Sequence, residues 1–282
     1  MRRRGRGGRG HRQGACRPQG PRRGGRGGVS APVSVLVTAR DEEEQLPGAL
    51  ASVAGWAAEV VVVVDPRTGD RTREVAGEAG SAVLEHVFSS SGAQCNWGAE
   101  RCRNDWVFVL DADERVSPAL RDAIGRALAA PEHAAYSVER TNLAFGRRLR
   151  FGDWGSDRVV RLFDRRRARF AERAVHGAVT AVSVGRLAGT LEHHTLRSLP
   201  QYLPKLHDYA LRGAAELVAG NRRATAAGAA ARAEWRFVRS FVVRLGFLDG
   251  GAGFVVAVLM AYGTFLKWTA VWDATTRRRA LP

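Results

Sequence analysis

Acidic residues follow apolar runs at three places in the first half of the chain. The pairs are Asp41 with Glu42, Asp65 with Asp70, and Asp111 with Asp113. Taken singly, such a pair is more typical of a solvated turn or a helix cap. Carboxylates that converge on one crevice repel each other unless a cation or ligand donors satisfy them. A diphosphate with Mg²⁺ or Mn²⁺ would do so, because carboxylate and phosphate oxygens together complete an octahedral shell.

Buried strands of a parallel sheet would bring these acids together. Three apolar runs predict buried strands at residues 33–38, 59–64 and 106–110, and a weaker strand is predicted at residues 82–86. Segments of helical periodicity alternate with them, at residues 46–56, 70–79 and 92–102. This order predicts an α/β fold with an open, mostly parallel sheet flanked by helices, whose ligands bind at the carboxyl ends of the strands. The acidic pairs fall at those ends.

Beyond residue 131 the alternation gives way to shorter strand-like runs, at residues 135–138, 158–163 and 175–180. We expect this half to complete the sheet antiparallel and to form an acceptor pocket. After Pro200 the chain reads as helical. The sequence therefore predicts three parts, namely a tail over residues 1–30, an α/β domain over 31–197 and a helical region over 198–282.

The tail carries much of the formal charge of +16 as arginines that alternate with glycine. It has too little apolar surface to offset chain entropy, so we expect it to be disordered. Such a tail either binds RNA or anionic lipid, or is a solvated extension. No aromatics interleave with the arginines to stack on bases, so nucleic acid is an improbable partner. With three cysteines in no disulfide or metal spacing and no apolar stretch of a signal peptide, we expect a cytoplasmic location.

Several linked motifs carry a family resemblance over residues 33–273. In order they are SVLVTARDEE, VVVVDPRTGDRT, GAQCNWGAERCRNDWVFVLDADERV, DRVVRLFDRRRARF, VHG, HHTLRSLPQYLPKL and RLGFLDGGAGF. The chain resembles the family 2 glycosyltransferases with the GT-A fold, in particular the branch of bacterial lipopolysaccharide-core glucosyltransferases. The resemblance implies a nucleotide-diphosphate sugar donor and transfer with inversion of the anomeric configuration.

By position, the resemblance implies that Asp65 hydrogen-bonds the nucleotide base and that the turn of Asp41 and Glu42 lies against base and ribose, with Thr38 also at the donor site. Asp113, with Asp111 beside it, would hold Mg²⁺ or Mn²⁺ on the diphosphate. Other positions that match the donor site are Asp70, Gln94, Asn96 and Arg161.

Arg158 and Arg161 resemble positions beside the active site, where they would pair with phosphate or else lie on a solvated strand face. Asp41 stands where the family often has Asn, and Pro66 and Arg67 replace a small Ser-Gly pair. These departures concern the choice of nucleotide more than the reaction.

The catalytic base should come from the second half of the chain, opposite the leaving diphosphate. The candidates are Asp153, Asp157, Glu172 and His176. Many relatives carry Glu after the VHG histidine where this chain has Gly177, so either this chain uses another group as the base or that Glu is not the base in the relatives. We predict Asp157 as the base and His176 as the second candidate, which would accept the proton itself or shape the pocket. No Ser or Cys nucleophile with a neighbouring base is apparent, which argues against a triad hydrolase.

The apolar segment at residues 251–272 is about as long as a bilayer-crossing helix and is followed by Arg277, Arg278 and Arg279. An interfacial or re-entrant helix has the same length and basic flank, and a soluble helix packed on the domain is a further alternative. The preceding segment, residues 234–248, carries Arg236, Arg239 and Arg244 and suits anionic headgroups. We expect peripheral or monotopic attachment to the cytoplasmic side of the inner membrane.

The leading hypothesis is metal-dependent transfer of a sugar to a cell-envelope glycan or a lipid-linked acceptor. One alternative is an RNA-associated nucleotide-binding protein that uses the Arg/Gly tail. Another is a sugar-phosphate nucleotidyltransferase, but no Gly-rich phosphate loop with a following Lys lies near the first strand.

Overall fold

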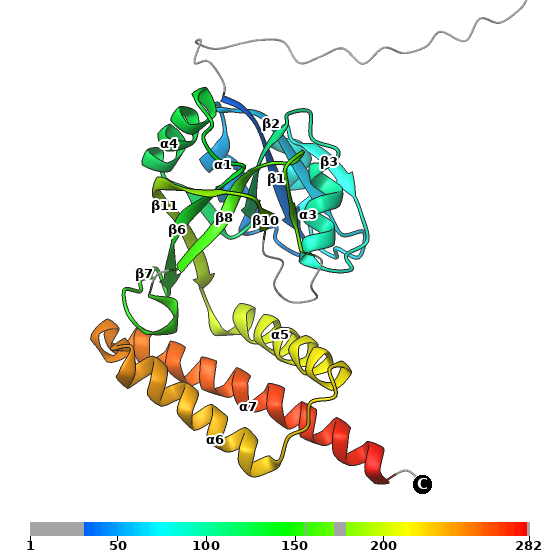
Figure 1. Ribbon diagram of the computed structural model, residues 1–282, viewed down its shortest axis with the longest axis vertical. Coiled ribbons are helices and arrows are strands. Elements are labelled where there is room, and N and C mark those ends of the chain that lie inside the picture. The colour runs from blue at the N-terminus through cyan, green and yellow to red at the C-terminus, as the bar shows by residue number, and fades with distance from the viewer. Residues whose placement is uncertain (1–30, 156, 172–178, 281–282) are drawn as a thin grey trace, which may run out of the picture.

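The computed structural model describes residues 31–155, 157–171 and 179–280, in a sheet with flanking helices and a separate layer of three helices below it (Figure 1). The predicted tail and the candidates Glu172 and His176 lie outside these residues. The strands are β1 (Ala31–Ala39), β2 (Ala57–Val64), β3 (Ala82–Glu85), β4 (Trp106–Asp111), β5 (Glu114–Val116), β6 (Ala135–Ala144), β7 (Arg147–Arg148), β8 (Asp157–Asp164), β9 (Ala168–Phe170), β10 (Val179–Ala181) and β11 (Val184–Leu196). The helices are α1 (Leu46–Val53), α2 (Thr72–Glu78), α3 (Ser91–Ala99), α4 (Pro118–Ala129), α5 (Leu199–Ala219), α6 (Ala226–Val238) and α7 (Gly250–Ala280), with short turns η1 (Gly152–Trp154), η2 (Arg239–Val243) and η3 (Gly246–Asp249).

The main sheet has the strand order β3-β2-β1-β4-β8-β6-β11-β5 among the described residues. Strands β3, β2, β1 and β4 are parallel, which confirms the α/β fold predicted from the alternating pattern. The chain runs outward from β1 to β2 and β3, then returns to place β4 on the other side of β1. Strand order therefore reverses between β1 and β4, and a ligand crevice is expected at their carboxyl ends.

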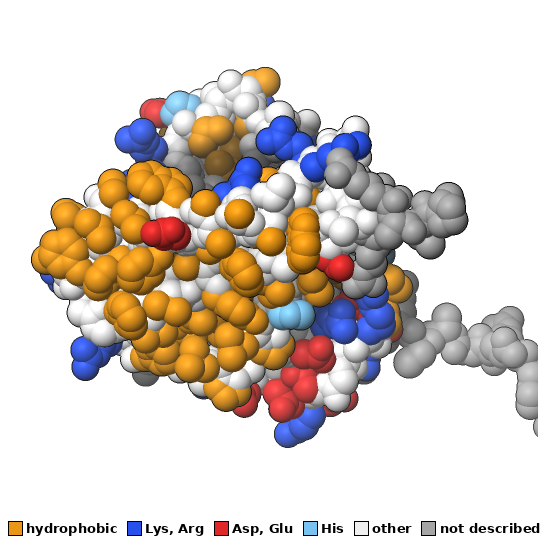
Figure 2. Space-filling view, turned by 90° about the horizontal axis from the view of Figure 1, so that it is seen from below, with side chains coloured by type: hydrophobic (Ala, Val, Ile, Leu, Met, Phe, Trp, Pro, Cys, Tyr) orange, Lys and Arg blue, Asp and Glu red, His pale blue; other side chains and the backbone are white. Residues whose placement is uncertain are grey.

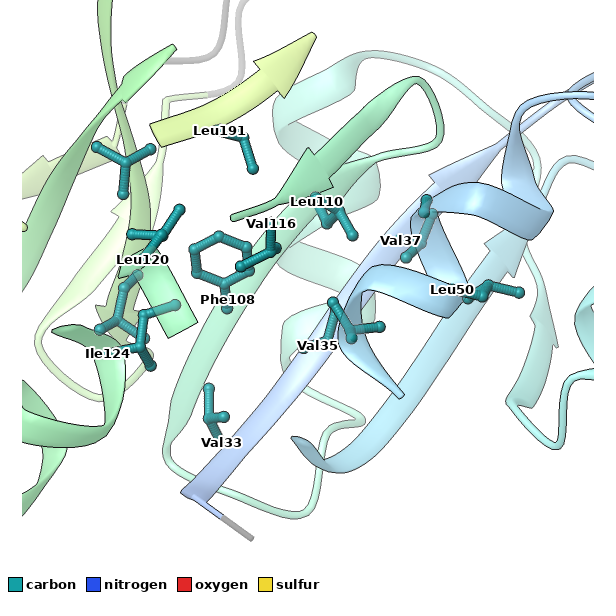
Figure 3. Packing of buried hydrophobic residues seen from close by; sticks show 14 of the residues in the cluster. Val33, Val35, Val37, Leu50, Phe108, Leu110, Val116, Leu120, Ile124 and Leu191 are labelled. Carbon is teal, nitrogen blue, oxygen red and sulfur yellow. The ribbon is translucent and has the colours of Figure 1, made fainter. Parts of the chain in front are cut away.

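The apolar runs of β1 and β4 form the centre of the core. Val33, Val35 and Val37 point to the face covered by α1 and α4, where they meet Phe108 and Leu110 (Figure 3). Leu36 points to the opposite face and packs with residues of β2 and α3. Because helices cover both faces of the sheet, the residues that point to either face are buried. The runs in these strands are therefore continuously apolar.

The second half of the sheet agrees only in part with the antiparallel arrangement we expect from the sequence. Strand β8 is antiparallel to both β4 and β6, but the long strand β11 runs parallel to β6. The sequence patterns do not predict β11, because polar residues and two register shifts interrupt its buried positions Leu187, Leu191 and Leu196. β11 leads directly into α5 and so links the sheet to the helical layer.

The helical layer consists of α5, α6 and α7, and α7 packs along both other helices (Figure 1). Gly263 of α7 allows this approach, since a Cβ there would lie 2.7 Å from Leu206 Cδ1 of α5. Within the described residues, one helical stretch, Gly246–Thr276, is long and apolar enough to cross a membrane by length and composition.

A substitution at Gly189 of β11 tests how closely α4 packs against this strand. The φ of Gly189 is +87°, and a Cβ would lie 2.3 Å from the backbone nitrogen of Leu120. We expect Gly189→Ala to lower the free energy of unfolding by more than about 2 kcal/mol, because left-handed backbone and overpacking both add cost. Gly125→Ala in α4, where nothing lies within 4 Å, is the control and should be neutral or slightly stabilising in the same urea titration. Equal stability of the two variants would contradict this account of the packing.

Candidate active site

The carboxyl ends of β1, β2 and β4 bring three of the predicted residues together. Thr38 of β1 lies opposite Asp111 of β4 in the parallel register. On the other side, the backbone N–H of Asp65, just after β2, donates to the carbonyl of Ala39 at 3.2 Å. The acids therefore lie around the point where strand order reverses.

The turn after β1 is held by residues that follow β2. Asp41 has φ +55°, and its Oδ1 accepts from the N–H of Gly69 at 2.8 Å. Asp70 accepts from the N–H of Glu43 at 2.9 Å through one oxygen and from the N–H of Thr72 at 2.9 Å through the other. Asp70 therefore fixes this turn and the start of α2, whereas the resemblance predicts a nucleotide contact for it.

Asp65 is 1% exposed and paired with Arg67. The Arg67 guanidinium donates to Oδ1 at 2.9 Å and to Oδ2 at 2.5 Å, and the Arg67 backbone N–H donates to Oδ1 at 3.0 Å. These hydrogen bonds outweigh burial and lower the pKa of Asp65 to about 2. A nucleotide base that binds Asp65 must share this carboxylate with Arg67 or displace it.

Gln94 and Asn96 use their amides on the protein itself. Gln94 accepts from His86 Nδ1 at 2.7 Å and donates to the His86 carbonyl at 3.1 Å. Asn96 accepts from the Phe170 N–H at 2.9 Å and donates to the Phe170 carbonyl at 3.0 Å. In this structure both side chains hold the backbone that follows β3 and ends β9, so contact with the nucleotide stays a prediction.

Below Asp111 lies a buried ion-pair network. Arg161 of β8 donates to Asp111 and, at 2.5 Å, to Glu114, which is completely buried. Burial raises the pKa of Glu114, although the charge of Arg161 opposes this. Burial would lower the pKa of Arg161, but Asp111 and Glu114 outweigh it and raise that pKa. Arg161 is therefore a charged residue inside the fold and does not lie on a solvated strand face.

Asp113 is paired with His193 of β11, at 3.4 Å between Oδ2 and Nε2. His193 Nδ1 lies 2.7 Å from the amide oxygen of Asn142, which can only accept, so Nε2 is the nitrogen left to face Asp113. Burial alone would raise the pKa of Asp113, but His193 outweighs it and holds that pKa well below its usual range.

This pair fits a divalent ion. Adjacent ligands of an octahedral ion with bonds of 2.0–2.2 Å lie roughly 3 Å apart. A histidine ligand commonly donates its other ring N–H to a carbonyl oxygen, as His193 does to Asn142. Among the described residues, no three His, Cys, Asp or Glu side chains are close enough to bind an ion by themselves, so water or ligand oxygens would complete the shell.

Helix α5 lies across the acidic edge and contributes Lys205, which the sequence patterns do not identify. Its Nζ donates to Glu42 at 2.6 Å. Burial raises the pKa of Glu42, and Asp113 and Asp111 add to this against the effect of Lys205. Lys205 and His193 lie in the motif HHTLRSLPQYLPKL, for whose residues the resemblance implies no particular role. Only their position in the fold distinguishes these two residues from other polar residues.

Two of the predicted base candidates lie in the described residues. Asp157 begins β8, is 40% exposed and accepts from Arg140 at 3.0 and 2.5 Å. Arg140 also lies 3.6 Å from Glu114, which connects Asp157 to the network under Asp111. Asp153 is 4% exposed and contacts three arginines of the helical layer, so it is not available to an acceptor.

Comparison with known proteins agrees with the resemblance at the level of the family and does not single out the lipopolysaccharide-core branch. Residues 34–188 match the sequence profile of the family described as Glycosyl transferase family 2. An uncharacterised glycosyltransferase of Rickettsia typhi is 26% identical over 88% of this chain and 89% of its own. The 4,4'-diaponeurosporenoate glycosyltransferase of Staphylococcus haemolyticus is 32% identical over 31% of this chain and 25% of its own. Among solved structures, glucosyl-3-phosphoglycerate synthase from Mycobacterium tuberculosis matches with a TM-score of 0.32 and 19% identity, over 40% of this chain and 43% of that chain.

The buried network predicts a specific stability effect. Arg161→Met removes the nearer of the two cations beside buried Glu114, so the free energy of unfolding should fall by about 3–5 kcal/mol in urea titration. Adding Glu114→Met should recover much of this loss, because the uncompensated charge is then gone. Arg158→Met, on the same strand with a 41% exposed side chain, should change stability by less than about 1 kcal/mol. A loss in Arg158→Met as large as in Arg161→Met would refute the assignment.

Proposed function

Since the chain belongs to glycosyl transferase family 2, we propose that it transfers a sugar from a nucleotide-diphosphate sugar to a cell-envelope glycan or a lipid-linked acceptor, with a divalent metal and with inversion. Family membership makes the chain a glycosyltransferase, which disfavours the RNA-associated and nucleotidyltransferase alternatives. The observation that carries the proposal is the convergence of Glu42, Asp111 and Asp113 at the reversal of strand order between β1 and β4.

The donor would lie along this edge. Asp65 and the turn of Asp41 and Glu42 would receive the nucleoside, beside Thr38. Lys205 would face the diphosphate from α5, where it already neutralises part of the charge of Glu42. These residues bind and orient the donor so that its anomeric carbon lies toward the second half of the sheet.

Mg²⁺ or Mn²⁺ would be held by Asp113 and His193, with the diphosphate oxygens as further ligands. Asp111 is already paired with Arg161, so it would be a neighbour of the metal site and not its main ligand. A bound divalent ion would supply charge neutralisation to the departing diphosphate.

Removal of either proposed ligand should remove most activity. We expect Asp113→Asn and His193→Ala to lower nucleoside diphosphate release at least about a hundredfold, because several kcal/mol of charge stabilisation is lost. Excess EDTA should have the same effect on the wild type, and added Mn²⁺ should reverse it. Asp122→Asn, on the exposed face of α4, is the matched control. Full turnover in excess EDTA would disprove metal dependence.

Asp157 is proposed as the base that takes the proton from the acceptor hydroxyl, with His176 as the second candidate. Asp157 is part of the network under Asp111 and is still reached by solvent. A single displacement with this base on the side away from the diphosphate inverts the anomeric configuration.

We expect Asp157→Asn to lower turnover at least about a hundredfold while nucleotide affinity barely changes. Glu139→Gln, which alters an acid opposite β8 in the neighbouring strand β6, should stay within a few-fold of the wild type. If Asp157→Asn also stays within a few-fold and His176→Ala abolishes transfer, the base is the histidine.

The proposed location is the cytoplasmic face of a membrane, with the helical layer as the attached part. Apolar side chains gather on the face of α6 and α7 seen from below (Figure 2). In α7, Phe254, Val258, Tyr262 and Phe265 are exposed at helical spacing. An exposed apolar patch of this kind marks a membrane or protein contact. Because α7 packs along α5 and α6, we propose attachment along the surface rather than crossing.

The triple variant Phe254→Ser, Val258→Ser, Phe265→Ser should lose co-sedimentation with lipid vesicles, because about 25 cal/mol per Å² of apolar contact with lipid disappears. The matched control is Val87→Ser, Val182→Ser, Val184→Ser, which changes exposed apolar residues of the sheet domain. We expect the control to sediment like the wild type. Loss of vesicle binding in the control alone, or in neither variant, contradicts attachment through α7.

A further inference from the structure

Three arginines converge on one buried carboxylate at the end of the helical layer. Asp153, in η1, lies 2.8 Å from Arg236 Nε, 3.2 Å from Arg239 Nη1 and 2.7 Å from Arg244 Nη1. The Asp153 side chain is 4% exposed, whereas the three arginine side chains are 34–44% exposed. The carboxylate therefore gathers the three guanidinium groups and leaves part of each open to solvent.

The charge of this cluster is not balanced by its own residues. One carboxylate faces three guanidinium groups, which carry more N–H donors than its two oxygens can accept. Asp249, the acid in the following turn, accepts from the backbone N–H of Arg150 at 3.0 Å and of Phe151 at 2.9 Å. Even when the charge of Asp249 is counted, three guanidinium groups face two carboxylates, so the arginine cluster keeps surplus positive charge.

The turn that carries the cluster is apolar and conformationally constrained. Val242, Val243, Phe247 and Leu248 are each about half exposed around η2 and η3. Leu245 between them has φ +59°, and η2 is a single π-helical turn. Such backbone costs of the order of 1–3 kcal/mol and persists only where the surrounding structure holds it in place. Here it holds apolar side chains in solvent beside fixed cations.

We propose that Arg236, Arg239 and Arg244 bind the phosphate of an anionic phospholipid headgroup while the adjacent apolar turn enters the leaflet. The proposal rests on the membrane attachment of the proposed function and adds a specific ligand to it. Guanidinium forks match phosphate oxygens in geometry, and a phosphate would balance the surplus charge. Acyl chains next to the headgroup would cover the exposed residues of the turn.

The experiment compares sedimentation with vesicles of phosphatidylcholine alone and of phosphatidylcholine with phosphatidylglycerol. Full-length wild type should bind the anionic vesicles at least about tenfold more tightly. The test variant is Arg239→Gln, Arg244→Gln, in which Arg236 stays as a partner for Asp153. It should lower this preference at least about threefold, since any remaining preference would come from the basic tail over residues 1–30, and it should keep nucleoside diphosphate release within twofold of the wild type. The matched control, Arg222→Gln, Arg223→Gln, lies in exposed positions at the other end of α6 and should keep the preference.

A further variant separates recognition from charge alone. Arg239→Lys, Arg244→Lys keeps the charge but loses the planar fork, so it should bind anionic vesicles less tightly than the wild type. Three results would overturn the phosphate site. The Gln variant could prefer anionic vesicles as strongly as the wild type, the control could lose as much of this preference as the Gln variant, or the Lys variant could bind anionic vesicles as tightly as the wild type. Equally tight wild-type binding to both vesicle types also overturns it, while membrane attachment stands. No binding to either vesicle type overturns both.

Discussion

The candidate site depends on one buried charge. Glu114 is completely enclosed, and a carboxylate cannot remain ionised there without a fixed cation. Arg161 supplies that cation and joins the turn after β4 to β8. The same guanidinium takes the carboxylate of Asp111, while the other Glu114 oxygen accepts from the Asp111 backbone N–H at 3.1 Å. These bonds fix the turn between Asp111 and Glu114. Asp113, which lies in this turn, is thereby placed beside His193.

This arrangement divides the acidic residues into two groups. Asp70, Asp111 and Glu114 are bound to backbone or to arginine, and they hold the shape of the edge. Glu42 and Asp113 instead meet Lys205 and His193, which belong to later elements. Removal of the partner of Glu114 leaves a buried charge and costs stability, whereas a change at Glu42 or Asp113 alters groups that a ligand can reach.

The sequence predicts those parts of the structure that depend on neighbouring residues, and it does not predict those that depend on residues far apart in the chain. The strands β1, β2 and β4 are predictable because burial on both faces demands continuous apolar runs, and their ends locate Asp65 and Asp111. Strand β11 is not predictable in this way, because register shifts make the spacing of its buried leucines irregular. The pairs of Arg161 with Glu114 and of Asp113 with His193 join residues distant in sequence, and no local pattern marks such partners.

Helix α5 connects the candidate active site to the rest of the helical layer. Lys205 contacts Glu42, while Arg197 and Gln201 contact Glu44, so one end of the helix is held to the turn after β1. Surface ion pairs of this kind are individually weak, but α7 packs along the other side of α5 and keeps it in place. If the face of α6 and α7 lies on the leaflet, Asp113 stands at least one helix diameter, roughly 10 Å, above the headgroups. Under the proposed attachment, an acceptor would have to present its hydroxyl at that height, as a lipid that already carries a glycan could and a bare headgroup could not.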